Sequence, residues 1–288
     1  MQKPAATPKP LVRSGTMLSV VRRLVVILGL IATVGLLAAC GKSRHLATAT
    51  TAHSATTTSA HARPPSSTPT GAAKPLTRTQ AIAFARAINL TAADVPGFRA
   101  TSKREHKHET AAEKQLALRL LRCAGGSSSS RDGLAKVSSK DFKLDHDVLH
   151  LSVNSEVSVA RTPSLVTKEL RGIHNNHVRG CLSHYFSLLL KHEILKEQKY
   201  RSTIGPISVS VSQGTPPAPG ATGSFWWRIA ATITVRNIKL PFYIDILGFA
   251  YGPAEVSLFS SGALKPFPAA AQEYLYRLLL KRTEAHSV

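Results

Sequence analysis

The sequence predicts an α+β domain in which a mostly antiparallel β-sheet packs against helices. Three observations favour this class: helix-like segments come first, period-two segments then follow one another with only turn residues between them, and a further helix closes the chain. Because strands joined by short turns pair antiparallel, we expect a sheet that helices cover on one face. The C-terminal part of the 288-residue chain, roughly 210 residues, is long enough for one such domain with a sizeable core.

Helical periodicity and capping residues mark the first part of this domain. Residues 79–90 (TQAIAFARAINL) predict a short helix, and residues 97–109 predict an extended, charged strand. Thr110 and Glu113 form a capping box for a helix that ends at the glycine pair 125–126. A serine-rich loop is expected to lead from this helix into the strands.

Alternation with period two marks the second part of the domain. Residues 149–159 are mainly apolar at odd positions and polar at even positions, which is typical of a long strand with one wet face. Two helices are expected next, one beginning at Thr162 and Pro163 and the other over residues 178–189. The remaining expected elements are four strands and a closing helix, at 207–211, 225–235, 242–246, 256–258 and from Pro266 onward.

A short apolar block near the N-terminus is typical of a signal peptide. Basic residues at 22–23 precede apolar residues 24–39, and this block is shorter than the roughly 20 residues that span a bilayer. Met17 is an alternative start, because the segment from Met17 already contains every part of a signal peptide. Gly35 and Gly41 do not form a phosphate loop, since five residues rather than four separate them.

The end of this block, Leu37-Ala38-Ala39-Cys40, resembles the lipobox of bacterial lipoproteins. In that family the cysteine thiol receives a diacylglyceryl group, and the cysteine becomes the new N-terminus after cleavage. The resemblance implies lipidation of Cys40 and an anchor with two acyl chains, which is enough for stable membrane attachment. It also implies an extracytoplasmic protein on the outer face of the cell membrane.

The residues after the lipobox predict a tether. Residues 41–77 are dominated by Ala, Ser, Thr and Pro and contain no Phe, Tyr, Trp, Ile or Val, so they cannot bury enough surface to order themselves. A plain spacer and an O-glycosylated stalk both fit this composition. The expected organisation is therefore a signal peptide at 1–39, a disordered tether at 40–77 and a globular domain at 78–288.

The chain is strongly basic. It has 37 Lys and Arg against 16 Asp and Glu, a net charge of +21, and 32 of the basic residues follow Cys40. Such a charge favours polyanions as partners, and the extracytoplasmic address favours anionic envelope lipids or polymers over nucleic acid. A solvated basic face without a polyanionic partner is the alternative.

The number of cysteines is consistent with the same extracytoplasmic location. If Cys40 carries lipid, Cys123 and Cys181 remain, both on apolar faces of expected helices. Outside the cytoplasm we expect them to form a disulfide, which would stabilise the fold by about 4 kcal/mol in the chain-entropy model. Two buried free thiols are the alternative, and the spacing excludes a CxxC metal or redox site.

No motif for catalysis, a cofactor or a metal is found. Histidines that could supply metal ligands are more simply surface residues, because no carboxylate or thiol stands at a recognised spacing; they are His106, His108, His174, His177 and His184. The segment 192–196 begins like a zinc-protease helix but has Lys196 in place of the second histidine. Nucleophile-elbow and catalytic-cysteine signatures are absent from the sequence. We therefore expect a non-enzymatic protein without a cofactor.

The most suggestive surface candidates lie in two late strands. Trp226 and Trp227 must face opposite ways, so we expect one in the core and the other outside. If Trp226 is external, it and Arg228 could contact a sugar or a lipid headgroup; alternatively, the proline-rich loop 215–219 or a terminal helix covers it. Asp245 would line a cleft or, alternatively, form an ion pair with Arg228 or Arg236.

The lipobox, the tether and the segment from LTAADVPGF to PFPAAAQEYLYRLLL together resemble actinobacterial lipoproteins. The late strands and the final helix also resemble the PknH-like extracellular sensor domain of mycobacterial receptor kinases. That family implies an α+β sandwich with a ligand cleft and two disulfides, whereas this chain has cysteines for one.

Three functions follow as hypotheses. The first is a lipid-anchored, sensor-like module that binds a ligand or partner, such as an acidic envelope lipid or polymer. A lipid or glycolipid carrier with an apolar cleft is the second, and a hydrolase is the third.

Overall fold

The computed structural model describes residues 76–101, 111–123, 133–146, 149–196 and 204–286. Cys40, the apolar block and almost all of the tether lie outside these residues. The helices are α2 (Arg78–Ile88), the 3-10 helix η1 (Ala92–Asp94), α3 (Ala111–Cys123), α4 (Pro163–Ile173), α5 (Asn176–Lys196) and α6 (Ala269–Ala285). The strands are β1 (Arg99–Thr101), β2 (Gly133–Ser138), β3 (Asp141–His146), β4 (Leu149–Ala160), β5 (Ile204–Gly214), β6 (Gly223–Val235), β7 (Ile238–Tyr251) and β8 (Ala254–Ala263).

Within the described ranges the strands form one eight-stranded sheet. Its order is β1-β3-β4-β8-β7-β6-β5, with β2 also paired to β4, and every pairing is antiparallel. The predicted α+β class is therefore confirmed. No helix in the described segments is both long enough and apolar enough to cross a membrane.

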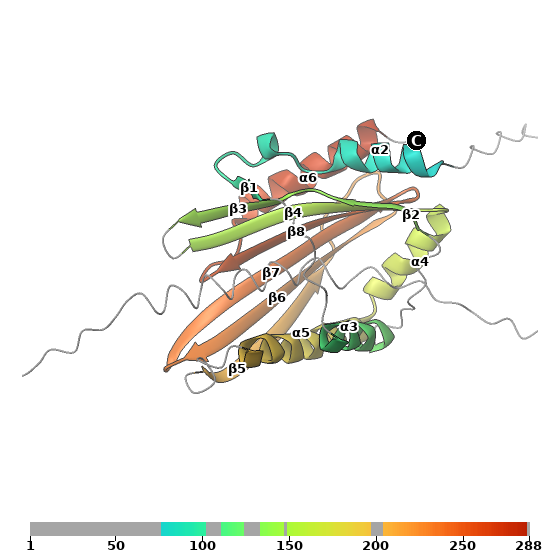
Figure 1. The fold of residues 1–288 in the computed structure, drawn as a ribbon. Helices are drawn as coiled ribbons and strands as arrows, with labels where there is room; N and C mark the ends of the chain where they lie inside the picture. The colour runs from blue at the N-terminus through green and yellow to red at the C-terminus, as the bar shows by residue number, and fades with distance from the viewer. Residues whose placement is uncertain (1–75, 102–110, 124–132, 147–148, 197–203, 287–288) are drawn as a thin grey trace, which may run out of the picture.

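Helices cover both faces of the sheet, so the expectation of one covered face was wrong. Figure 1 shows α2 and α6 on one side, and α3, α4 and α5 on the other. The reason lies in β7, which is apolar at both parities. Ile244 and Ile246 point into the core under α4 and α5, whereas Leu247 and Phe249 point into the core under α2 and α6. Apolar side chains on both faces of a central strand require cover on both sides.

Each face has its own hydrophobic core. In the first, Trp227 of β6 and Phe242 of β7 are almost fully buried and belong to the same cluster as Leu182 and Leu190 of α5. In the second, the ring of Phe249 meets the ring of Tyr276 edge-on, with their centroids 5.6 Å apart. Burial of each large apolar side chain contributes roughly 1.5–3 kcal/mol, so both cores hold the helices on the sheet.

The even-numbered face of β4 is not wet, although the sequence predicted that it would be. His150, Asn154 and Glu156 are only 4%, 7% and 6% exposed. Each has a polar partner on a neighbouring strand: Asp145 for His150, Asp141 for Asn154, and both Ser138 and Lys136 for Glu156. A polar pattern predicts a face that needs hydrogen bonds. Here protein groups supply them, except at His150 Nε2, which has no partner among the described residues.

The remaining elements match the sequence to different degrees. Helix α2 begins with a capping box between Thr77 and Gln80. Of the strand expected at 97–109, the described part is β1, and the capping box at Thr110 falls outside the described residues. The strands β2 and β3 were not predicted.

Candidate functional site

Strands β6 and β7 bring the three predicted surface residues together. Trp227 is 1% exposed in the core, and Trp226 points to the opposite face and is half-buried, as the alternation of a strand requires. Arg228 follows on the same face as Trp226. Asp245 is the direct partner of Arg228 in the register of β6 and β7.

Asp245 is the centre of this group. Its side chain has no exposed surface, and it accepts hydrogen bonds from Arg228 Nε (2.7 Å), Arg228 Nη2 (3.0 Å) and Trp226 Nε1 (3.2 Å). These hydrogen bonds raise the pKa of Arg228 above its ordinary value, although burial opposes the shift. The guanidinium carbon of Arg228 lies 5.4 Å from the centroid of the Trp226 ring. Both the orientation of Trp226 and the charge of Arg228 are therefore fixed.

A groove of about 410 Å³ opens beside this group. Trp226 and Leu247 come from the sheet, residues 215–217 come from the proline-rich loop, and the rest comes from the first turns of α6. The loop and the helix are the two segments that were expected to cover Trp226. They flank it and leave a groove, whose lining residues are Thr215, Pro216, Pro217, Trp226, Leu247, Ala269, Gln272, Glu273, Tyr276 and Arg277.

The wall contributed by α6 is polar. Gln272 is buried and donates from Nε2 to Ser260 Oγ at 2.6 Å, while Glu273 and Arg277 form an exposed ion pair one turn apart. Tyr276 is 3% exposed, and its hydroxyl has no hydrogen bond of good geometry to any residue of the described segments. Burial raises the pKa of Tyr276 to about 12, although the nearby Ser224 hydroxyl partly offsets the shift. The phenol is therefore neutral at physiological pH.

A second hollow of about 190 Å³ adjoins the groove and shares Thr215 and Trp226 with it. Gly214, at the end of β5, lines this hollow. A Cβ atom on Gly214 would lie 2.9 Å from Cε3 of Trp226, closer than side chains normally approach. Because Gly214 has no side chain, the indole ring of Trp226 can occupy this space.

The groove has the chemistry of a binding site. It combines an indole and apolar side chains with a few hydrogen-bonding groups, and its volume lies within the range of about 300–1,000 Å³ of small-ligand pockets. Of the three residues predicted from the sequence, Trp226 lines the groove, whereas Arg228 and Asp245 lie beside it and do not line it. The lining residues Gln272, Tyr276 and Arg277 were not predicted. No local signal could have found them, because the groove joins three segments that are distant in the chain.

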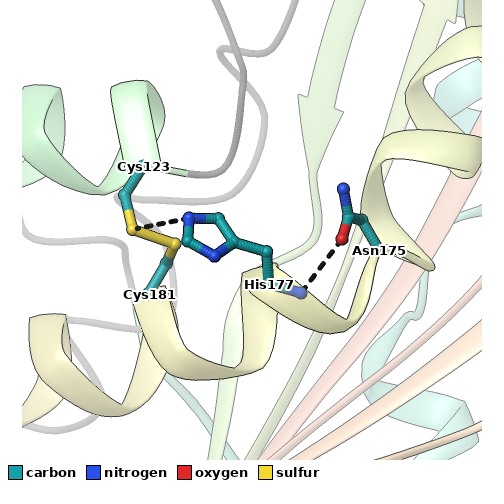
Figure 2. Close-up of a disulfide and its surroundings, with 4 residues drawn as sticks. All are labelled: Cys123, Asn175, His177 and Cys181. Carbon is teal, nitrogen blue, oxygen red and sulfur yellow. Dashed lines mark hydrogen bonds between the residues drawn. A yellow bond between two sulfur atoms is a disulfide. The ribbon is translucent and has the colours of Figure 1, made fainter.

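The predicted pairing of Cys123 with Cys181 is confirmed. The disulfide joins the end of α3 to α5, with the two Cα atoms 5.7 Å apart. Figure 2 shows the imidazole of His177 beside it, with Nε2 3.8 Å from Cys123 Sγ. His174, His177 and His184 are all exposed, whereas the pair at 106–108 lies outside the described residues.

The layer of α3, α4 and α5 carries much of the positive charge. Its exposed cations within the described ranges are Arg119, Arg122, Lys168, Arg171, Arg179 and Lys191. The acidic residues Glu169 and Glu193 of the same helices are only partly exposed. This helical layer lies on the opposite side of the sheet from α6, whose first turns form one wall of the groove (Figure 1).

No protein-family model matches the sequence, and no curated protein matches it significantly. Among solved structures, the chain is similar to the extracellular domain of PknH from Mycobacterium tuberculosis. The superposition covers 73% of this chain and 98% of that chain, with 8% sequence identity and a TM-score of 0.36. The resemblance to that family is therefore weak.

Proposed function

We propose that the protein is a non-enzymatic, lipid-anchored binding module of the cell envelope, and that the groove beside Trp226 takes the headgroup of an envelope glycolipid or a unit of an acidic polymer. The observation that carries the proposal is the groove itself, in which a positioned indole faces apolar and polar groups together. The anchor is implied by the lipobox resemblance at Cys40.

An amphiphilic ligand fits the two kinds of wall. Trp226, Leu247 and the prolines offer apolar surface to a sugar face or the start of an acyl chain. Gln272, Glu273 and Arg277 offer amide, carboxylate and guanidinium groups to hydroxyl or acidic substituents. A purely apolar ligand would cover this polar wall without forming hydrogen bonds to it, which costs binding energy.

The charge of the domain supports the acidic class of ligand. From Cys40 onward the chain has 32 basic and 16 acidic residues, a net charge of +16, which concentrates polyanions near the molecule; this effect weakens as salt screens it. The exposed cations of α3, α4 and α5 lie away from the groove, so they increase the rate of encounter and do not select the headgroup. Binding should therefore weaken in moderate salt but keep its preference among headgroups.

The test is a titration of the full-length protein with short-chain anionic glycolipids and acidic oligosaccharides, followed by calorimetry. We expect Trp226→Ala to weaken binding at least tenfold, about 1.4 kcal/mol. Tyr274→Ala is the matched control, because Tyr274 is an exposed aromatic residue of α6 that does not line the groove. Equal binding by both variants, or no binding by the wild-type protein at low salt, would contradict the proposal.

The apolar part of the groove also supports the alternative of a lipid carrier. Native mass spectrometry distinguishes the two functions. A lipid that co-purifies with the wild-type protein, and that Trp226→Ala loses, would favour the carrier. Reversible headgroup binding by a protein that purifies free of lipid would favour the binding module.

A further inference from the structure

The two cysteines of the disulfide between α3 and α5 differ in their exposure to solvent. Cys123 at the end of α3 is exposed, whereas Cys181 inside α5 is only 3% exposed. His177 is exposed and precedes Cys181 by four residues, so both side chains lie on the same side of α5. A reagent in solvent can therefore reach Cys123 and His177 together.

The three side chains converge closely enough to share a ligand. The two sulfur atoms and a ring nitrogen of His177 all lie within 4.8 Å of one another. His177 is held by the start of α5, where its backbone N–H donates to Asn175 Oδ1 at 3.0 Å (Figure 2). Helix α3 is held against α5 independently of the sulfur atoms, because Leu120 is 5% exposed in the core.

We propose that reduction of the Cys123–Cys181 disulfide converts this cluster into a binding site for a thiophilic divalent cation of the Zn²⁺ class, and that the reverse exchange, with a disulfide as the oxidant, re-forms the bond and releases the ion. Two cysteine sulfurs and one imidazole nitrogen form a donor set that binds zinc, with water in the fourth position. Thiolate and imidazole ligands also select zinc over the hard cations Mg²⁺ and Ca²⁺.

The redox step balances with a dithiol as the reductant. One thiolate of the dithiol attacks the exposed Cys123 sulfur, the bond between the two cysteine sulfurs breaks, and Cys181 leaves as a thiolate. The second thiolate of the dithiol then attacks the mixed disulfide, which releases Cys123 as a thiolate and leaves the reductant as a cyclic disulfide. Two electrons pass to the protein, and the cation takes the place of the protons that the two thiols would otherwise hold.

The geometry needs only a local adjustment. Zn–S bonds of about 2.3 Å and Zn–N bonds of about 2.0–2.1 Å place tetrahedral ligand atoms roughly 3.5 Å apart. The ring nitrogen of His177 already lies within 4.8 Å of both sulfur atoms, which is close to the separation that a tetrahedral site requires. The two sulfur atoms can move apart to this separation once the bond between them is broken. Cys123 is at the exposed end of its helix, so its side chain can rotate without disturbing a core.

The test uses Co²⁺ as a spectroscopic substitute for Zn²⁺ on the full-length protein, reduced and then freed of reductant without oxygen. We expect a thiolate-to-cobalt charge-transfer absorption and tetrahedral d–d bands, both lost on adding Zn²⁺ or on reoxidation. His177→Ala should weaken Co²⁺ affinity by at least about 10- to 100-fold, since the loss of a ligand costs no less than the loss of a group that only orients a ligand. His184→Ala, an exposed histidine of the same helix outside the cluster, should leave the affinity unchanged.

Two results would overturn the proposal. One is reduced protein that gives no thiolate-to-cobalt absorption. The other is an absorption that is as strong, with the same affinity, in His177→Ala as in the wild-type protein. The second result would mean that the thiols bind the metal without His177.

Discussion

Arg228 on β6 holds the carboxylate of Asp245 on β7 through two hydrogen bonds, from Nε to Oδ1 at 2.7 Å and from Nη2 to Oδ2 at 3.0 Å. The same carboxylate accepts a hydrogen bond from the indole of Trp226. An ion pair with a fully buried carboxylate and a partly exposed guanidinium thus determines how Trp226 is oriented at the edge of the groove. It links the stability of the sheet to the geometry of the proposed site.

Removing the cation of this pair should destabilise the protein strongly. Arg228→Met leaves the charge of Asp245 buried without its partner, and breaking such a pair costs about 3–5 kcal/mol. Urea denaturation measures the change in the free energy of unfolding. Adding Asp245→Leu to Arg228→Met should recover most of the loss, because no unpaired charge then remains. As a control, Arg277→Gln breaks an exposed pair and should cost at most about 1 kcal/mol. A loss below 1 kcal/mol in Arg228→Met would show that the pair is not buried as described.

A methyl group at Gly214 should displace the Trp226 ring. Gly214→Ala places a Cβ 2.9 Å from the indole, so the ring must move toward the groove or the solvent. The chain has two tryptophans, and Trp227 is in the core, so a shift of the fluorescence spectrum reports on Trp226. We expect a shifted spectrum and weaker ligand binding. Gly205→Ala on the same strand meets Thr234 at an ordinary 3.4 Å and should change neither.

The order of elements could be predicted from the sequence because each depends on local periodicity and capping. The cover on both faces of the sheet could have been predicted too, from the nearly continuous apolar run at 242–250. The serines of β8, by contrast, suggested a sheet face that is exposed to solvent. Ser257, Ser260 and Ser261 are all buried, which sequence polarity alone does not reveal.

Stability should fall as the pH rises, because of Glu255. Burial raises the pKa of Glu255 to about 8, and the carboxylates of Glu169 and Glu156 add to the shift. The folded protein therefore keeps a proton that the unfolded chain releases above its ordinary pKa of 4.5. The stabilisation that this bound proton gives to the folded state is complete below about pH 4.5. It is lost between pH 4.5 and pH 8, at about 1.4 kcal/mol per pH unit.

Glu255→Gln removes this dependence, because the amide stays neutral at every pH. Thermal or urea denaturation from pH 5 to pH 9 measures this. As the pH rises, the free energy of unfolding of the variant should increase relative to that of the wild-type protein. Glu273→Gln, which changes an exposed carboxylate of α6, should follow the wild-type curve. Parallel curves for the wild type and Glu255→Gln would refute the assignment.

The disulfide should contribute to stability on its own. Cys123 and Cys181 are 58 residues apart, and closing a loop of this length stabilises the fold by about 4 kcal/mol in the chain-entropy model. Cys123→Ser removes the bond at its exposed end without opening a core cavity. Its free energy of unfolding should match that of the reduced wild-type protein. If Cys123→Ser unfolds like the oxidised wild type, the bond has no role in stability.

The candidate site was only partly predictable. The position of Trp226 on the face opposite Trp227, beside Arg228, follows from strand alternation. The pairing of Asp245 with Arg228 was one of several open alternatives. The groove depends on where α6 and residues 215–217 pack, which long-range contacts decide. The position of His177 beside the disulfide likewise required the packing of α3 on α5.

Footprinting of side-chain oxidation by hydroxyl radicals, with and without a saturating anionic glycolipid headgroup, tests the central claim most directly. Trp226 and Tyr274 are both accessible aromatic side chains, but Trp226 lines the groove and Tyr274 does not. The proposed function predicts that the ligand protects Trp226 and leaves Tyr274 unchanged. Protection of Tyr274 alone, or of neither residue while binding is saturated, would contradict it.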